Sequence, residues 1–502
     1  MHAKTSIPPS RARGAERGET MANEVFGTGA NPAAGAAEDA PPVGRIVLVA
    51  ATAALGGFLF GYDTAVINGA VAAIRGWSHV GDALLGFSVA SALLGSAVGA
   101  WFAGPLADRY GRIPVMQVAA VLFFLSSIGS GLAWDIWSLT AFRMVGGLAV
   151  GAASVIAPAY IAEVSPAQMR GRLGSLQQMA IVVGIFAALL VDYALAAAAG
   201  GASGKLAFGL EAWRWMFVSA ALPALIYGVF AGLIPESPRY LVAKQRIQEA
   251  ARVLERFVSR RPPPEVKIAE IQQSMQRESK QSLQDLKGPA FGLLPVVWVG
   301  ILLSVFQQFV GINVIFYYSS VLWRAVGFTE ANSLAITVIT SVTNILTTLI
   351  AIGLVDRLGR RPLLLIGSVG MAVALGTMAF VFASAPTQAV GDATVPVLGD
   401  TQGVVAIIAA NLYVVFFGMS WGPVVWVLLG EMFNNRIRAY ALAVAAAAQW
   451  VANFVVSQTF PALASAGLGF AYGIYAAMAL LSFFFVVRFV QETRGRELED
   501  MA

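Results

Sequence analysis

The sequence lacks cysteine altogether and contains only two histidines, His2 and His79, among 502 residues. The absence of cysteine excludes disulfide bonds and thiol catalysis, and two distant histidines argue against a histidine metal site. Charged residues make up only 12% of the chain, against about 25% in soluble domains, whereas 58% of the residues are hydrophobic. The composition therefore predicts a polytopic membrane protein, and we expect no metal, no cofactor and no enzymatic activity.

Twelve long apolar runs follow an N-terminal segment that is rich in alanine, glycine, proline and charge. Each run is long enough to cross a bilayer as a helix, and the runs form two groups of six around a polar segment. We expect an all-α membrane protein: two pseudo-symmetric six-helix bundles and a cytoplasmic helical linker. The expected spans are 46–72, 83–104, 115–133, 138–162, 171–198, 212–233, 292–321, 331–354, 362–384, 402–431, 439–461 and 467–489. The expected domains are a disordered tail at 1–43, bundles at 44–234 and 291–490, a linker at 235–290 with short helices, and a C-terminal tail at 491–502.

The positive charges have an uneven distribution along the chain. Of 33 lysines and arginines, 28 fall at the two chain ends (up to Arg45 and from Arg488 on), in the linker or in the loops after even-numbered spans. The positive-inside rule then places both termini in the cytoplasm. This topology accounts for the net charge of +5, so we expect no nucleic-acid partner.

The two halves repeat each other in the charged loops. GPLADRYGRIP at 104–114 corresponds to GLVDRLGRRP at 353–362, and each follows the second span of its half. Glu163 precedes Arg170 by seven residues, as Glu431 precedes Arg438. Duplicated six-helix units are typical of transporters that bind substrate between the repeats near the bilayer midplane.

The motifs resemble those of the major facilitator superfamily, specifically its sugar porters. The matching stretches, in the family's order, are GYDTAVINGA, DRYGR, PAYIAEVSPAQMRGRLGSLQQ, PESPRYL, QQFVGINVIFYYS, DRLGRRP, WGPVVWVLLGEMFNNRIR and QETRGREL. The resemblance covers about residues 45–500 and implies a bacterial proton-coupled monosaccharide symporter of the glucose or xylose type. It also implies a multi-pass protein of the bacterial cytoplasmic membrane that functions as a monomer.

Charged residues recur in matched positions at the cytoplasmic end of each half. One interpretation is that these charges only set the membrane topology and lie solvated in the loops. The other, which the resemblance implies, is that they form a network of ion pairs that holds the halves together when the cavity opens outward. Exposed ion pairs are individually weak, about 0–1 kcal/mol each, but a network could bias two conformations. One departure from the family is Ile113, where a basic residue is common. The expected gating residues are Asp108, Arg109, Arg112, Glu163, Arg170, Glu236, Arg239, Asp356, Arg357, Arg360, Glu431, Arg438, Glu492 and Arg494.

The second half is rich in amide and aromatic side chains, which suit the hydroxyls and the apolar face of a sugar. A lone amide could equally serve interhelical packing. A straight helix would turn Gln308 and Asn313 about 140° apart, so we predict a break near Gly311. The resemblance assigns sugar binding to Gln178, Gln307, Gln308, Asn313, Trp426 and Gln449, and places Phe60, Ile185, Tyr317, Asn344, Trp450 and Asn453 along the pocket. At Ile185 the bacterial xylose symporter has a glutamine, which favours glucose over xylose here.

Three ionisable residues fall inside the apolar runs: Asp63, Arg143 and Asp192. Such residues are costly in a bilayer and need partners, so we expect an ion pair between Asp63 and Arg143. The pair could be static, or Asp63 could be a proton switch, as the resemblance to proton-coupled sugar porters implies. Asp192 is expected at the outer interface, without a special role.

The predicted function is proton-coupled uptake of a monosaccharide, most simply glucose, with xylose or galactose as alternatives. A facilitative uniporter of the same fold remains an alternative, in which Asp63 is structural only. A non-transporting sugar sensor and a drug exporter are weaker options, because the C-terminal tail is short and PESPRYL is present. The chain has no Walker motif, which argues against ATP as the energy source.

Overall fold

Most of the chain beyond the N-terminal tail is described by a computed structural model, which covers 43–165, 170–257, 263–278, 283–390, 393–434 and 437–493. The predicted tail before Val43 and the C-terminal residues 494–502 lie outside the described residues. Within them, twelve helical segments are long and apolar enough to cross a membrane. The predicted all-α membrane fold with twelve spans is therefore confirmed.

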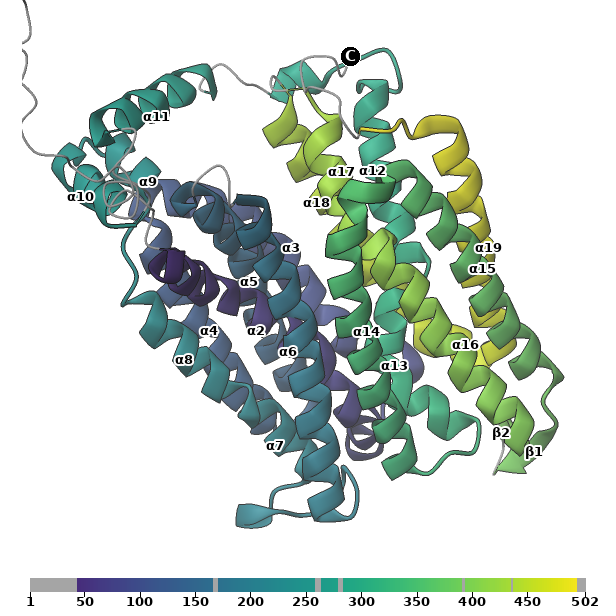
Figure 1. Cartoon of the computed structure of the whole chain (residues 1–502). Coiled ribbons are helices and arrows are strands. Elements are labelled where there is room, and N and C mark those ends of the chain that lie inside the picture. The colour runs from purple at the N-terminus through teal and green to yellow at the C-terminus, as the bar shows by residue number, and fades with distance from the viewer. Residues whose placement is uncertain are drawn as a thin grey trace, which may run out of the picture. The chain divides into compact units, whose positions relative to one another are not determined.

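Apart from two isolated β-bridges, the regular elements described in the first six spans and the segment after them are helices (Figure 1). The first half consists of α2 (Val43–Ser78), α3 (Asp82–Tyr110), α4 (Arg112–Gly131), α5 (Ile136–Val164), α6 (Arg170–Ala199), η1 (Ala207–Gly209), α7 (Ala212–Ser219) and α8 (Ala221–Ala231). The polar segment forms α9 (Pro238–Ala243), α10 (Ile247–Phe257), α11 (Pro264–Glu278) and η2 (Leu283–Leu286).

The last six spans include a small hairpin that the sequence analysis did not predict. They consist of α12 (Pro295–Phe309), α13 (Ile312–Ala325), α14 (Glu330–Leu358), α15 (Arg360–Ser384), β1 (Thr387–Val390), β2 (Ala393–Pro396), α16 (Asp400–Met419), α17 (Trp421–Met432), α18 (Arg438–Ala466) and α19 (Leu468–Phe489). Strands β1 and β2 pair antiparallel in the loop between α15 and α16. The hairpin leaves the helical fold class unchanged.

Local sequence explains where several helices begin. The carboxylate of Asp135 accepts a hydrogen bond from Ser138 N at 2.7 Å and so caps α5. This backbone bond lowers the pKa of the exposed Asp135 carboxyl. At α9, Ser237 caps the helix and Pro238 occupies the first turn, where its missing N–H costs nothing.

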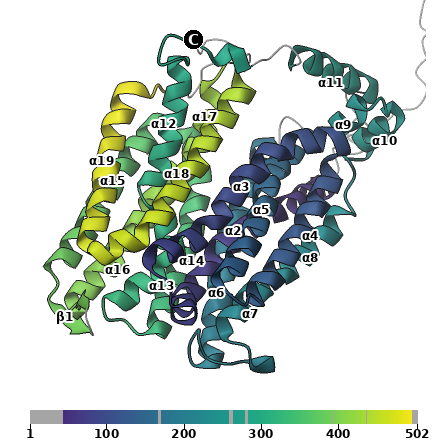
Figure 2. The ribbon, with the colours of Figure 1, turned by 180° about the vertical axis from the view of Figure 1, so that it is seen from behind.

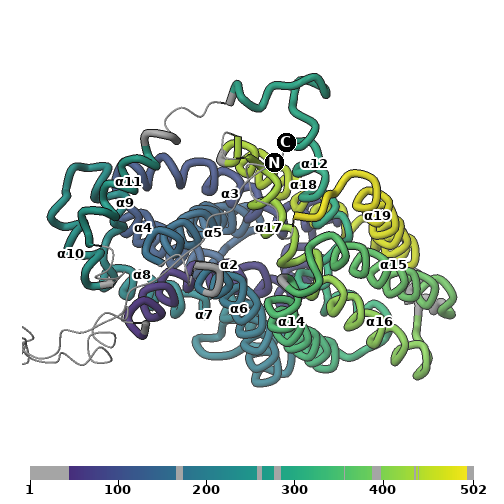
Figure 3. The backbone as a smooth tube through the Cα atoms, turned by 45° about the horizontal axis from the view of Figure 1, so that its top comes forward, coloured from purple at the N-terminus to yellow at the C-terminus, as the bar shows by residue number. Residues whose placement is uncertain are grey.

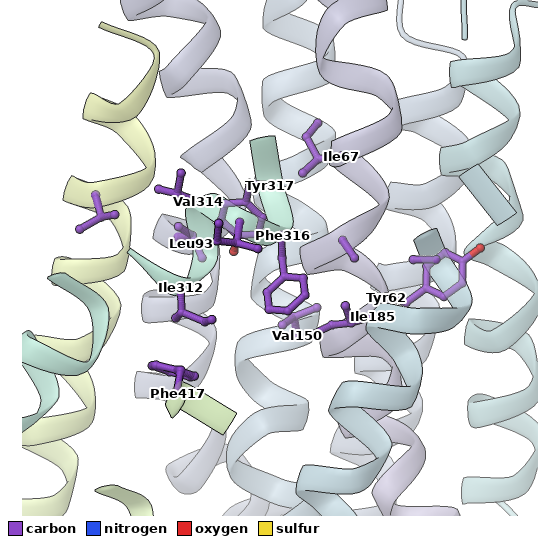
Figure 4. Packing of buried hydrophobic residues seen from close by; sticks show 14 of the residues in the cluster. Tyr62, Ile67, Leu93, Val150, Ile185, Ile312, Val314, Phe316, Tyr317 and Phe417 are labelled. Carbon is purple, nitrogen blue, oxygen red and sulfur yellow. The ribbon is translucent and has the colours of Figure 1, made fainter. Parts of the chain in front are cut away.

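Small residues allow the helices of the first half to pack closely. A Cβ atom added to Gly61 of α2 would lie 1.9 Å from the carbonyl oxygen of Ile181 on α6, and one added to Gly147 of α5 would lie 2.0 Å from that of Ala92 on α3. Backbones that approach this closely are typical of helix packing in membranes. Figure 4 shows the apolar side chains that fill the remaining space, including Ile185 between α6 and α2.

Among the described residues, the most extensive contacts between the two halves are made by three pairs of helices. Helix α2 packs against α13, α3 against α18 and α6 against α14. Figure 2 shows α3 beside α18, and Figure 3 shows α6 beside α14. Each pair joins one helix of the first half to one helix of the second, so these six helices border the space between the repeats.

Candidate substrate and proton site

A break interrupts the seventh span at the predicted position. Helix α12 ends at Phe309, α13 begins at Ile312, and Gly311 between them has φ +85°, in the left-handed region. Only glycine adopts this conformation readily, and an added Cβ would lie 2.9 Å from the ring of Tyr475. The prediction of a break near Gly311 is confirmed.

Three of the predicted substrate-binding amides form a hydrogen-bonded chain across this break. Asn313 Nδ2 donates to Gln308 Oε1 at 2.6 Å, and Gln308 Nε2 contacts Gln307 Oε1 at 3.4 Å. Gln307 Nε2 in turn donates to the carbonyl oxygens of Trp421 and Gly422 at 2.9 and 3.1 Å. The break thus brings both flanking amides into one polar chain, which a straight helix could not do.

The tenth span is also broken, which the sequence analysis missed. Helix α16 ends at Met419 and α17 begins at Trp421, with Ser420 in a non-helical conformation. Pro423 was the available signal, because a proline has no N–H to continue the hydrogen-bond ladder of α16. At the other break, Tyr413 donates its hydroxyl to the carbonyl oxygen of Val310 at 2.8 Å. The residues beside each break therefore interact with the other broken span.

Other predicted substrate residues have their own contacts. Phe60 of α2 and Trp450 of α18 pack with ring centroids 5.6 Å apart, so this aromatic pair joins the two halves. The hydroxyl of Tyr317 on α13 interacts with the side chains of Thr64 on α2 and Asn453 on α18. These contacts place aromatic and hydroxyl groups from both repeats next to one another.

The remaining predicted residues have no recorded hydrogen bond to this amide chain. Gln178 and Gln449 are half-buried on α6 and α18, and the oxygen Oε1 of Gln449 is buried without a hydrogen-bond partner among the described residues. Asn344 is buried on α14, whereas Trp426 of α17 is 42% exposed. Ile185 is buried in the packing of α6 against α2 (Figure 4).

The expected ion pair in the first half is present. Arg143 Nη1 of α5 lies 3.1 Å from Asp63 Oδ1 of α2, and the two side chains are 3% and 13% exposed. The guanidinium also lies over the ring of Phe217, 5.7 Å from its centroid. Tyr317 from the second half interacts electrostatically with both charged residues. Tyr317 therefore lies close to the ion pair and also contacts Asn453, one of the expected pocket residues.

Asp192 is enclosed within the protein, which the expectation of a position at the outer interface did not foresee. Its exposed fraction is 0%, and its Oδ2 accepts a hydrogen bond from Gly69 N at 3.1 Å. A Cβ added to Gly69 would lie 2.8 Å from the Asp192 carboxyl group. Apolar runs give the depth of a residue along its helix but not the face on which it lies.

The first residues of α4 and α15, Arg112 and Arg360, form equivalent ion pairs. Arg112 donates from Nε and Nη2 to the two carboxylate oxygens of Glu163 at 3.0 and 2.9 Å. Arg360 donates in the same way to Glu431 at 2.9 and 2.8 Å. Both pairs are bidentate, a geometry that strengthens the interaction and fixes its orientation.

Two further carboxylates repeat this symmetry. Glu236 accepts hydrogen bonds from the backbone N–H groups of Arg112 and Ile113, and Glu492 accepts them from those of Arg360 and Arg361. We call this side of the molecule, with Arg112, Glu163, Glu236, Arg360, Glu431 and Glu492, the charged end. Both bidentate pairs join residues of the same half. The clamp between halves, which is expected when the cavity opens outward, stays a prediction.

The other expected gating residues lie at or near the charged end where they are described. Asp108 lies 3.1 Å from Arg112, Arg109 is exposed, and Arg438 Nε donates to the carbonyl oxygen of Phe433. Arg239 and Arg357 belong to α9 and the end of α14. The side chains of Arg170 and Asp356, and the whole of Arg494, fall outside the described residues.

Polar contacts between the halves gather at the opposite ends of the helices. Asn68 of α2 donates from Nδ2 to Phe316 O at 2.9 Å and accepts at Oδ1 from Ser320 N at 3.0 Å, both on α13. Ser465 of α18 donates to Asp82 of α3 at 2.5 Å. We call this region, defined by Asn68, Asp82, Phe316, Ser320 and Ser465, the sealed end. The sequence analysis missed Asn68 because one amide in an apolar helix has no distinguishing pattern.

An apolar groove elsewhere on the molecule is separate from these residues. It lies between α15 and α16, and it contains none of the predicted substrate residues. Its lining is Gly370, Val373, Ala374, Thr377, Val405, Ile408, Ala409, Leu412 and Phe416. This groove therefore does not belong to the candidate substrate site.

Comparisons with known proteins agree with this architecture. The chain matches the family model "Sugar (and other) transporter" over residues 49–502. It is 58% identical to the "Glucose transport protein" of a Synechocystis strain, over 94% of this chain and 100% of that protein. It is 38% identical to the "D-xylose-proton symporter" of Escherichia coli K12, over 91% of this chain and 95% of that one.

A solved structure of the Escherichia coli xylose transporter XylE in an inward-open conformation superposes with a TM-score of 0.75 at 37% identity, covering 91% of this chain and 99% of that chain. Another, described as a major facilitator superfamily proton:xylose symporter bound to 6-bromo-6-deoxy-D-glucose, gives a TM-score of 0.74 at 36% identity. The match of sequence and fold extends over both six-helix halves, and the chain belongs to the sugar transporter family of the major facilitator superfamily.

Proposed function

We propose that this protein takes up a monosaccharide, with glucose as the preferred substrate, across the bacterial cytoplasmic membrane together with protons. The observation that carries the proposal is the buried ion pair of Asp63 and Arg143, which Tyr317 of the other half approaches. The relative with 58% identity is named a glucose transport protein, and more distant relatives are named xylose–proton and arabinose–proton symporters.

The sugar would bind beside the broken spans. Asn313, Gln308 and Gln307 present amide groups that can donate to and accept from hydroxyls, as a neutral polyol requires. Phe60 and Trp450 would cover an apolar face of the ring from opposite halves. Gln178, Gln449 and Trp426 complete the proposed contacts, and Asn344 and Asn453 would line the pocket. None of these side chains carries a charge, which suits a neutral substrate.

The proton would bind at Asp63. In the described conformation Arg143 compensates the carboxylate, because a buried charge without a partner costs several kcal/mol. A movement that separates Arg143 from Asp63 would make the protonated carboxyl the more stable form. Proton binding and release would then depend on the position of α5 relative to α2. Tyr317 interacts with both the ion pair and the pocket residue Asn453, so it would couple that position to sugar binding.

Alternating access would use the two ends in opposite ways. The contacts of Asn68 with α13 close the sealed end, and we place this end outside the cell. The charged end would face the cytoplasm by the positive-inside rule, which also predicts both termini on that side. The bidentate pairs Arg112–Glu163 and Arg360–Glu431 would brace α4 against α5 and α15 against α17 during rocking. We propose that the transporter works as a monomer in the lipid bilayer.

Uptake into proteoliposomes tests the proposal. Labelled glucose should accumulate above equilibrium when an inward proton gradient is imposed, and Asp63→Asn should abolish accumulation while exchange of sugar continues. Asp400→Asn is the matched control, because Asp400 is exposed in the first turn of α16, remote from the ion pair. Wild-type protein that only equilibrates the sugar, or accumulation that survives Asp63→Asn, would contradict the proposal and favour a uniporter.

A further inference from the structure

Asp192 on α6 is a second buried carboxylate, and proton coupling through Asp63 does not require it. Its exposed fraction is 0%, and one of its oxygens accepts the N–H of Gly69 on α2. The other oxygen, Oδ1, is buried and has no hydrogen-bond partner among the described residues. The side chain is therefore enclosed and only half satisfied.

No positive charge compensates Asp192 within the part of the chain that the structure describes. Helix α6 packs against α2, α5, α7 and α14. The titratable or charged side chains described on these helices are Arg45, Tyr62, Asp63, Arg75, Arg143, Tyr160, Glu163, Arg214, Glu330 and Arg357. Arg75, Arg143 and Arg214 each form an ion pair with a different carboxylate. Arg45 and Arg357 lie near the other ends of their helices, and Tyr62 interacts electrostatically with Asp192.

The surroundings favour the neutral acid. An ionised carboxylate that is removed from water without a cation loses its hydration and gains little in return. A protonated carboxyl avoids this cost and still accepts the Gly69 N–H through one oxygen. We propose that Asp192 is a second proton-binding site, separate from Asp63, which holds its proton while the sealed end is closed.

The position of Asp192 relates its proton to the state of the sealed end. Gly69 directly follows Asn68 on α2. The Asn68 side chain bonds to α13, and the Gly69 N–H bonds to Asp192 of α6, so these two residues connect α2 to both helices. Gly69 lies six residues beyond Asp63, about 9 Å along the helix axis. Opening of the sealed end would separate α2 from α13 and α6 from α14. Water would then reach Asp192, solvate its charge and let the proton exchange with the medium on that side.

Infrared spectroscopy of the full chain in liposomes tests this assignment. At neutral pH the spectrum of wild type should contain the C=O stretching band of a protonated carboxyl, which Asp192→Asn removes and Asp63→Asn retains. Asp192→Glu provides the second variant, because it keeps the acid and should shift the band. A spectrum that neither Asp192 variant changes would show that Asp192 is ionised and would overturn the proposal.

The exchange step has its own measurement. Asn68→Ala removes the side-chain contacts to α13, so the Asp192 band should be lost at lower pH than in wild type, and it should shift faster after transfer to D2O. A band that responds to pH and D2O as in wild type would overturn the link to the sealed end. Neither measurement needs sugar or a proton gradient, so their failure would leave the role of Asp63 untouched.

Discussion

Replacement of Gly311 by alanine should destabilise the broken seventh span. Gly311 has φ +85°, and the left-handed conformation costs a residue with a Cβ about 1–2 kcal/mol. The new methyl group would also lie 2.9 to 3.2 Å from three ring carbons of Tyr475, and overpacking of this kind costs about 1–3 kcal/mol. Together the two effects predict a loss of about 2–5 kcal/mol.

The same change should weaken sugar binding, because the break aligns Gln308 with Asn313. Thermal unfolding in detergent and isothermal titration with glucose measure the two effects. Gly376→Ala is the matched control: Gly376 is helical in α15, and nothing lies within 4 Å of an added Cβ. In a Tyr475→Ala background the steric part of the loss should disappear and the conformational part should remain. A Gly311→Ala protein with wild-type melting temperature and glucose affinity would refute this reasoning.

Three further changes test other parts of the site. Arg112→Ala leaves the partly buried carboxylate of Glu163 without its partner and should lower the free energy of unfolding by about 3 kcal/mol. Arg252→Ala is the control, because Arg252 is exposed and its loss should change stability by less than about 0.5 kcal/mol. Equal effects of the two changes would contradict the bracing role of Arg112. Asn68→Ala should increase maleimide labelling of a single cysteine introduced at the buried Ser457. The chain has no other cysteine, so the labelling reports this position alone. Unchanged labelling would argue against a role of Asn68 in closing the sealed end. Tyr317→Phe removes the hydroxyl that interacts with Thr64 of the other half. It should reduce proton-driven accumulation of sugar several-fold while sugar exchange continues. Unaltered accumulation would exclude a coupling role of Tyr317.

The fold and the family could be predicted from sequence because their signals are local. Twelve apolar runs give the spans, and motifs such as PESPRYL keep their order along the chain. The break at Gly311 could also be predicted, because two amides five residues apart cannot share one face of a straight helix. The ion pair of Asp63 and Arg143 followed from the small number of charges inside the spans.

Other features depend on helix orientation and on partners far along the chain. The burial of Asp192 depends on which face of α6 meets Gly69, and the alanine-rich end of that helix has no clear periodicity. The repeats indicate which charged residues correspond between the halves but do not report their partners, and the bidentate pairs of Arg112 and Arg360 lie within one half each. Asn68 acts through backbone groups of α13, which no side-chain pattern reports.

The most direct test of the central claim is proton movement driven by sugar. Proteoliposomes that contain a pH-sensitive dye, without any imposed gradient, should acidify inside when glucose is added outside. Asp63→Asn should abolish this acidification while labelled glucose still exchanges across the membrane. Acidification of equal size in wild type and Asp63→Asn, or sugar entry into wild-type vesicles without acidification, would contradict the claim that Asp63 carries the coupled proton.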